Sequence, residues 1–468
     1  MAKSVLYIGI AALIILNCSF TVSAVSIGKL PGLRLGEKPE QTAPTEDVPA
    51  DVEAPDLSEP LTLEQCIEIA LKRASEIRTA QLDLKLEDMN VSNARSAYLP
   101  EISTGGSYQF SENVDFGWEK ENYDASVSAR YVIWDHGQRE GSLAQAKARR
   151  EAEYSRYDRT GQSLIFNVIN GYYSVLEAEK LIAVDEQLLD QSKQNVEKIK
   201  ALVEVGIAIE SDIATARVQQ ASDELAVIDD LNNLDLAKSN LAVIMGLDPG
   251  VSFSLVDAPD YETYMQTGVI EIEEISIEDA VSQALANRPE MAELKSNQAA
   301  LEWALTLARL ERWPRITADF GYDVMLDDYL RERDALKNHK SWDVSARVSY
   351  PIFDGGQSRR TVQRAEIAME KMNESTSELQ RSIALEIHQA YFSLERTRKS
   401  LDITSVQIED ARMSLDVAQG RYEQQMIILL ELLDSQTRYA RSLTNQVKAF
   451  YDYKVAKRTL ERAMGVLQ

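Results

Sequence analysis

Two carboxylates near the C-terminus, Glu431 and Asp434, come closest in type and spacing to a chemical site. Residues three apart lie on one face of a helix, so this pair could bind a cation or exchange a proton. No histidine or cysteine stands nearby to act as a base or a nucleophile. On the residues alone, an ordinary solvated helix face explains the pair better than a reactive site.

The rest of the sequence does not indicate catalysis. The three histidines, His136, His339 and His388, are scattered and lack the spacing of metal ligands. Walker loops, nucleophile elbows and dinucleotide-binding glycine patterns do not occur in the sequence. Cys66 falls in an apolar helical pattern, which favours a buried packing residue. The sequence therefore predicts a protein that is not an enzyme and that needs no cofactor or metal.

The chain is strongly acidic, with 75 acidic and 50 basic residues and a net charge of −25. This charge excludes nucleic acid as a partner, because nucleic-acid binding requires a basic face. Acidity promotes solubility, and in a pore it would favour cations. Composition alone leaves both explanations open.

The N-terminus has the pattern of an export signal. Lys3 precedes an apolar run over 5–16, and small residues at 22–24 suit cleavage, so we expect a signal peptide over 1–24. A retained anchor is the alternative, but the run is short for a membrane span. Lipidation at Cys18 is a second alternative. Residues 25–60 are rich in proline and acidic residues, which predicts a disordered leader.

Two long stretches, 101–248 and 352–468, contain no proline and therefore permit very long helices. The region from Gln138 to about Lys200 is rich in helix formers, and Leu181, Val184 and Leu188 repeat at coiled-coil spacing. About 60 helical residues would reach about 90 Å. A soluble coiled-coil spacer would share this pattern.

Four short segments, 102–111, 123–133, 316–324 and 342–352, alternate between apolar and polar residues. Alternation predicts strands with one apolar and one polar face. A half-buried soluble sheet would alternate as well. The length of about 10 residues, the aromatic residues near the strand ends and the export signal favour strands in an outer membrane.

The sequence repeats itself. The matching segments are Leu61–Glu64 with Ile275–Glu278, Leu99–Pro100 with Trp313–Pro314, Trp134–Gln138 with Phe353–Gln357, and Met245–Gly246 with Met464–Gly465. Each repeat therefore reads helix, strand, strand, long helix, turn, helix. Four strands are too few to close a membrane barrel, so strands in a membrane require several copies of the chain.

The duplication sets the predicted domain boundaries. We expect a first repeat over 61–246, with a hairpin at 101–134 and long helices over 138–246, then a linker over 247–274. The second repeat should cover 275–468, with a hairpin at 315–353 and long helices over 357–465.

The repeated pattern over 61–466 resembles the TolC family of outer-membrane efflux and secretion channels. The most specific stretches are Tyr350–Gly356 and Glu431–Gln436, together with Val205–Ile207 and Ser211-Asp212. The resemblance implies a mainly α fold with membrane β-structure: a homotrimer whose chains share one twelve-stranded β-barrel above a coiled-coil periplasmic tunnel. It also implies two partners, a periplasmic adaptor (membrane fusion) protein and an inner-membrane pump or ABC-type secretion transporter.

The resemblance also assigns positions in this chain. It implies that Glu431 and Asp434 form an acidic ring narrowing the tunnel, and that Asp212 and Tyr422 help to hold neighbouring coils shut. Where the best-known pattern has an arginine, this chain has Ile427, so closure by apolar packing is the expectation. The tip that would contact the adaptor consists of Val205, Gly206, Ile207, Gln424 and Gln425.

The predicted function is thus a passive exit duct in the outer membrane, gated at the periplasmic tip and contacting outer-membrane lipid. A non-conducting exported coiled-coil protein, structural or adhesive, is the alternative. It explains the helices and the charge but leaves the four repeated strands without a purpose.

Overall fold

The computed structural model describes residues 57, 59–113, 118–256, 261, 264, 275–327 and 340–467. The chain divides into two compact units, Met1–Val52 and Glu53–Gln468, and every described residue belongs to the second. The expected signal peptide, nearly all of the leader and most of the linker lie outside the described residues.

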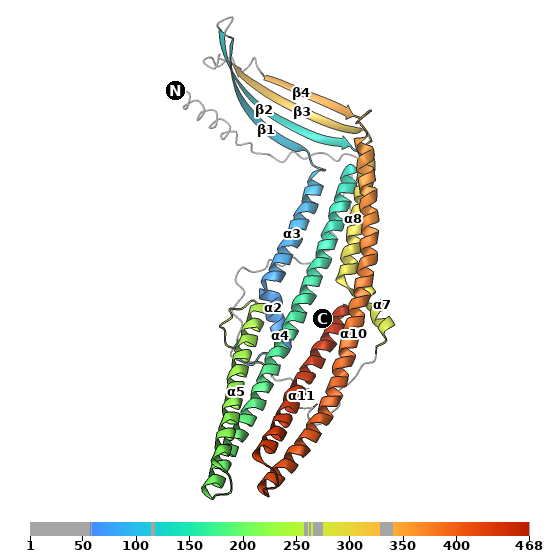
Figure 1. Ribbon diagram of the computed structural model, residues 1–468. Coiled ribbons are helices and arrows are strands. Elements are labelled where there is room, and N and C mark those ends of the chain that lie inside the picture. The colour runs from blue at the N-terminus through green and yellow to red at the C-terminus, as the bar shows by residue number, and fades with distance from the viewer. Residues whose placement is uncertain are drawn as a thin grey trace. The chain divides into compact units, whose positions relative to one another are not determined.

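The two repeats build the same order of elements (Figure 1). The first consists of α2 (Leu63–Arg73), α3 (Ser75–Ser96), β1 (Glu101–Asn113), β2 (Trp118–Trp134), α4 (Gln138–Glu204) and α5 (Glu210–Ile244). The second consists of α7 (Ile277–Asn287), α8 (Pro289–Leu310), β3 (Arg315–Asp327), β4 (Lys340–Ser349), α10 (Gln357–Glu423) and α11 (Leu429–Ala463). The predicted duplicated, mainly helical fold with four strands is confirmed.

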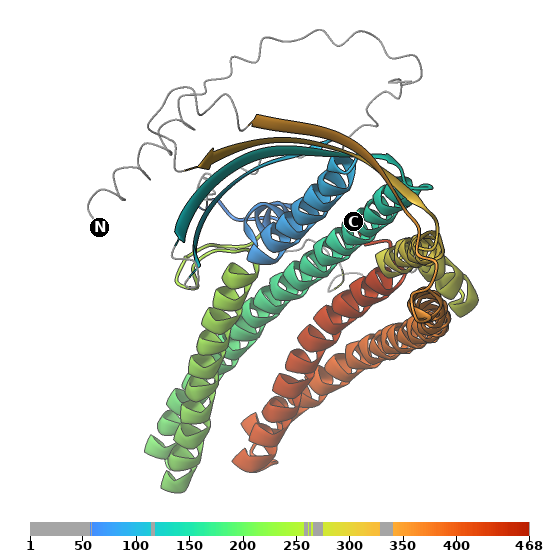
Figure 2. The same cartoon turned by 90° about the horizontal axis from the view of Figure 1, so that it is seen from above.

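The four strands form one antiparallel sheet in the order β1-β2-β3-β4, which curves as seen in Figure 2. Glu101 pairs with Arg130 in the first hairpin, and the corresponding Arg315 pairs with Ser349 in the second. The duplication therefore extends to the hydrogen-bond register. Strands β1 and β4 are the two edges of this sheet.

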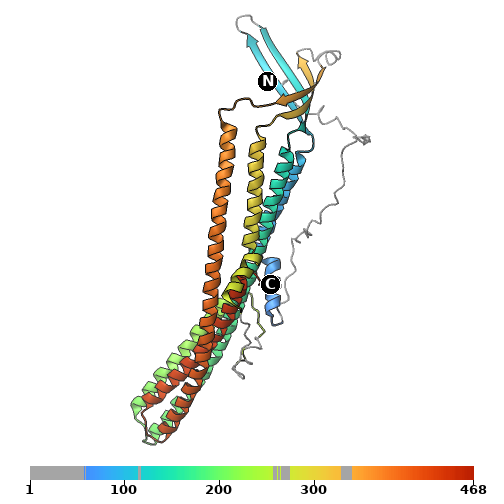
Figure 3. The same ribbon diagram turned by 90° about the vertical axis from the view of Figure 1, so that its right-hand side faces the viewer.

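The long helices pack as two antiparallel pairs, α4 with α5 and α10 with α11. Nearer the sheet, α3 packs on α4, α4 on α8 and α8 on α10, as Figure 3 shows from the side. Helices α4 and α10 each have 67 residues, which corresponds to about 100 Å of rise. Such lengths are possible because neither sequence contains a proline.

The turn that leads from the second strand of each hairpin into the long helix is stabilised in the same way in both repeats. Asp135 accepts hydrogen bonds from two backbone N–H groups of the following turn, and Asp354 does the same. Strand β4 ends at Ser349, although the alternation predicts extension to residue 352. Pro351 explains the early end, because it has no N–H to donate to a ladder.

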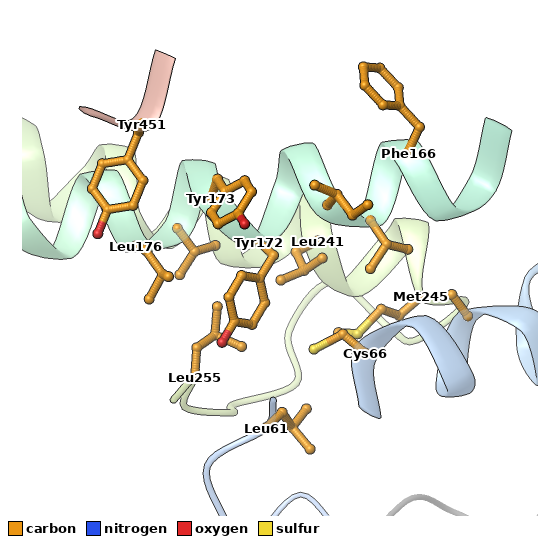
Figure 4. Packing of buried hydrophobic residues seen from close by; sticks show 14 of the residues in the cluster. Leu61, Cys66, Phe166, Tyr172, Tyr173, Leu176, Leu241, Met245, Leu255 and Tyr451 are labelled. Atoms are coloured by element: carbon orange, nitrogen blue, oxygen red, sulfur yellow. The ribbon is translucent and has the colours of Figure 1, made fainter. Parts of the chain in front are cut away.

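The main apolar core lies where α2, α4, α5 and α11 meet (Figure 4). Tyr172 donates a 2.6 Å hydrogen bond to the carbonyl of Val256, which ties the segment after α5 to α4. Cys66 is fully buried here, as expected for a packing residue, and burial raises the pKa of its thiol to about 12. This core fixes the base from which both coiled-coil pairs extend.

None of the helices in the described ranges has the combination of length and apolar character that a membrane span needs.

Candidate functional site

The first candidate site is the turn between α4 and α5, at the end of the first coiled coil. Gly206 has a φ of 74°, in the left-handed region that suits glycine. Its N–H donates to Val203, and the N–H of Ile207 donates to Leu202 at 2.9 Å. These bonds satisfy the last carbonyls of α4, so the chain reverses direction within a few residues.

The turn between α10 and α11 reproduces this geometry with a different residue. Gln425 occupies the place of Gly206 and has a φ of 58°. Its N–H donates to Tyr422, and the N–H of Met426 donates to Arg421 at 2.9 Å. The turn predicted at Gln424 and Gln425 is therefore present, although a non-glycine residue in this conformation costs roughly 1 kcal/mol.

Both turns expose apolar side chains to solvent in the single chain. The exposed residues are Val205, Ile207 and Ile209 in the first turn, and Met426, Ile428 and Leu430 in the second. Exposed apolar groups gathered at one end of a structure are typical of a protein-binding surface.

An apolar cluster joins the two coiled coils just behind these turns. Its buried members are Val196, Ile199, Ala216, Leu415, Ala418, Leu429, Leu432 and Leu433. Ile427 packs against this cluster and so contributes apolar contact between the pairs. Burying these side chains favours the arrangement in which the two tips lie together.

Two polar links cross between the coiled coils beside the cluster. Asn195 in α4 donates a 3.1 Å hydrogen bond to Gln436 in α11, and Lys198 forms a 2.8 Å ion pair with Glu423 in α10. Neither of these two pairings is predicted from the sequence. Their partners lie 241 and 225 positions apart in the chain, and no local pattern marks such pairs.

Asp212 and Tyr422 also come together across the two pairs, at the start of α5 and the end of α10. Burial, and then the charge of Asp212, raises the pKa of the Tyr422 hydroxyl. No hydrogen bond joins the two side chains in the described structure of this chain. Their contact is thus electrostatic within one copy.

Glu431 and Asp434 both lie on the exposed face of the first turns of α11, while Leu432 and Leu433 between them are buried. Asp434 forms a 2.7 Å ion pair with Arg438, one turn further along. Glu431 lines an open groove of about 380 Å³ together with Arg421 and Asp410. The two carboxylates share a face, as predicted, but each has different neighbours.

At this end of the molecule, apolar packing and two polar links hold the helix pairs together. Among the described residues, no group of three or more histidine, cysteine or acidic side chains is placed to hold a metal ion. The contacts at the tip are apolar packing and weak polar links, which suit a closure that opens and shuts.

Comparison with known proteins assigns the chain to a family. The family model described as outer membrane efflux protein matches residues 66–247 and 280–466, so one match falls on each repeat. The outer membrane protein TolC of Vibrio cholerae is 22% identical over 396 residues, covering 83% of this chain and 86% of that protein.

Solved structures agree on the fold. A CusC structure superposes with a TM-score of 0.74 at 16% identity, covering 89% of this chain and 98% of that one. The Campylobacter jejuni CmeC outer membrane channel gives a TM-score of 0.73 at 16% identity, covering 86% and 85%. With both repeats matched, the chain belongs to the outer membrane efflux protein family and is a TolC-type channel of the outer membrane, not an enzyme.

Proposed function

We propose that three copies of this chain close one twelve-stranded barrel and form the exit duct of a tripartite efflux pump or a type I secretion system. Strands β1 and β4 leave the sheet of one copy open at both edges. An open edge cannot face lipid, because its backbone groups would lack hydrogen-bond partners. The edges of neighbouring copies must therefore pair with each other.

The duplication predicts the register of that pairing. Within one copy, β2 pairs with β3 so that Val127 faces Tyr322. The corresponding residues of β4 and β1 are Ala346 and Tyr108, so these two should face each other between copies. This register places the apolar face of β4 next to the apolar face of β1, as a lipid-facing surface requires.

The helices support the same arrangement. Gln138 at the start of α4 donates a 3.4 Å hydrogen bond to the carbonyl of Leu310 at the end of α8. Gln357 and Ser96 are the corresponding residues at the start of α10 and the end of α3. They have no such contact within one copy, so Gln357 should donate to Ser96 of the neighbouring copy.

Cysteine cross-linking tests the assembly. Tyr108→Cys combined with Ala346→Cys should give covalent trimers on a non-reducing gel, because directly paired residues lie within reach of a disulfide. The control is Tyr108→Cys with Val348→Cys, which keeps the face but shifts the register by two residues. A folded monomer that cross-links with neither pair would exclude the shared barrel.

We expect the two turns at the ends of the coiled coils to contact the partner proteins. The exposed apolar turns at Val205 to Ile207 and at Gln424 and Gln425 offer docking sites for a periplasmic adaptor, which would connect the duct to an inner-membrane pump or ABC-type transporter. Co-purification of an adaptor from the same envelope tests this idea. Val205→Asp with Ile207→Asp should abolish co-purification, whereas Glu210→Gln, a polar exchange beside the same turn, should not. Equal recovery with all variants would remove the tip from the interface.

A further inference from the structure

An open hollow of about 420 Å³ lies between the C-terminal end of α8 and the N-terminal end of α10. These ends of the two helices lie next to the sheet, as Figure 3 shows. The hollow is lined by Arg309, Arg312, Arg359, Val362, Gln363 and Glu366.

The hollow is cationic in a chain whose net charge is −25. Arg309 forms a 3.5 Å ion pair with Glu366, which is the only carboxylate in the lining. Arg312 and Arg359 are exposed, and neither has an ion-pair partner in the part of the chain that the structure describes. Two guanidinium groups therefore remain available to an anion from outside the chain.

The duplication shows that the fold does not require this charge. The first repeat builds the same junction between α3 and α4, where Arg95, Tyr98 and Glu140 stand at the positions of Arg309, Arg312 and Arg359. One arginine is common to both junctions, while the other two are replaced by a tyrosine and a glutamate. Since both junctions form, the helix packing does not require arginine at positions 312 and 359.

Aromatic contacts join the end of α8 to the end of β2. The register shifts between Val132 and Trp134, which brings Trp134 opposite Ile316, a residue of the apolar face of the sheet. His136 meets Trp134 edge-on and stacks on Trp313 at 4.2 Å between ring centroids. Trp313 directly follows Arg312, which lines the hollow, so the hollow lies close to these aromatic rings.

The surroundings suit the boundary between lipid tails and water. Trp313, next to Arg312 in the chain, is 52% exposed, and Tyr350, just after β4, is 59% exposed. Tryptophan and tyrosine concentrate at the headgroup level of membranes, where long arginine side chains reach phosphates. A cationic hollow at that level faces headgroups.

We propose that this hollow binds the phosphate of an anionic phospholipid, held by Arg312 and Arg359. The planar guanidinium group donates paired hydrogen bonds to phosphate oxygens, and its apolar stem can lie along the lipid. Basic pockets at the ends of membrane-spanning segments bind anionic headgroups in this way. The site rests on the membrane placement of the sheet and is independent of conduction and of the gate.

Native mass spectrometry of the delipidated trimer, titrated with phosphatidylglycerol or with phosphatidylethanolamine, tests the site. The wild type should retain phosphatidylglycerol preferentially. Arg312→Gln with Arg359→Gln should weaken that binding by about 25-fold, at about fivefold per arginine, and leave phosphatidylethanolamine unaffected. Arg95→Gln, which removes a positive charge from the corresponding junction of the first repeat, should leave phosphatidylglycerol binding unchanged.

Three outcomes would overturn the proposal. The first is equal phosphatidylglycerol binding by the double variant, and the second is an equal loss in Arg95→Gln, which would indicate general charge attraction. The third is displacement of the lipid by millimolar inorganic phosphate, which would assign the hollow to soluble anions. Planar-bilayer conductance of the double variant should match the wild type, so a failure of the lipid site is distinguishable from a failure of the channel.

Discussion

Lys198 and Glu423 form a 2.8 Å ion pair that ties α4 to α10 near the ends of the two coiled coils. Their side chains are 48% and 60% exposed, so solvent screens the pair and weakens it. If the tip closes the channel as proposed, a weak link beside an apolar cluster suits a closure that has to open. The ion pair joins α4 and α10, which belong to different antiparallel helix pairs of one chain. Breaking it would allow these two pairs to separate.

Reversing this link should favour the open channel. Lys198→Glu places two carboxylates where an ion pair stood, and we expect open times in planar-bilayer recordings to lengthen by a few fold. The exchange Lys198→Glu with Glu423→Lys should restore the wild-type open time. If the double exchange stays as open as the single variant, the pair does not contribute to closure.

The acidic face of α11 should bind multivalent cations if three copies gather it around an axis. Glu431→Ala with Asp434→Ala should weaken block by hexaamminecobalt about tenfold or more, because six carboxylates would be lost from the assembly. Asp416→Ala, on α10, serves as the control for general loss of negative charge. Unchanged block in the double variant would place these residues outside the conducting path.

The two tip turns should respond in opposite directions to matched exchanges. Gln425→Gly relieves a left-handed backbone and should raise stability by about 0.5–1 kcal/mol, whereas Gly206→Ala should lower it by about 1 kcal/mol. A Cβ at Gly206 would meet nothing within 4 Å, so the cost comes from the backbone alone. Urea unfolding followed by helical circular dichroism measures both, and a loss of stability in Gln425→Gly would contradict this explanation.

Asp185 should make the first coiled coil less stable as pH rises. Burial, and then the charge and hydrogen bond of Asp230, raises the pKa of Asp185 from 3.8 to about 6. A raised acid pKa gives stability that is present below pH 3.8 and is lost as pH rises through about 6.

Asp185→Asn should therefore stabilise the protein at pH 7.5, by about 1 kcal/mol once solvent screening is considered, and should have little effect at pH 4. Thermal unfolding at the two pH values measures the difference. The control is Asp229→Asn, which removes the carboxylate next to Asp230 on α5. An equal gain at both pH values would show that the effect does not come from titration of Asp185.

The sequence by itself determined the architecture and the family. Alternating residues in Tyr123–Ile133 and the absence of proline after Pro351 reflect local backbone requirements, so strands and long helices are readable from the chain. The duplication adds the order of the elements. These features depend on neighbours in sequence or on a copy of the same pattern.

Only the tertiary structure decided how the tip is linked and where charge collects. Asn195 with Gln436, and Lys198 with Glu423, join residues more than 200 positions apart, and nothing periodic marks such residues. Arg312 and Arg359 likewise become one cationic hollow only because α8 and α10 pack together below the sheet. Packing between distant segments creates these sites, and packing depends on the whole fold and not on a local pattern.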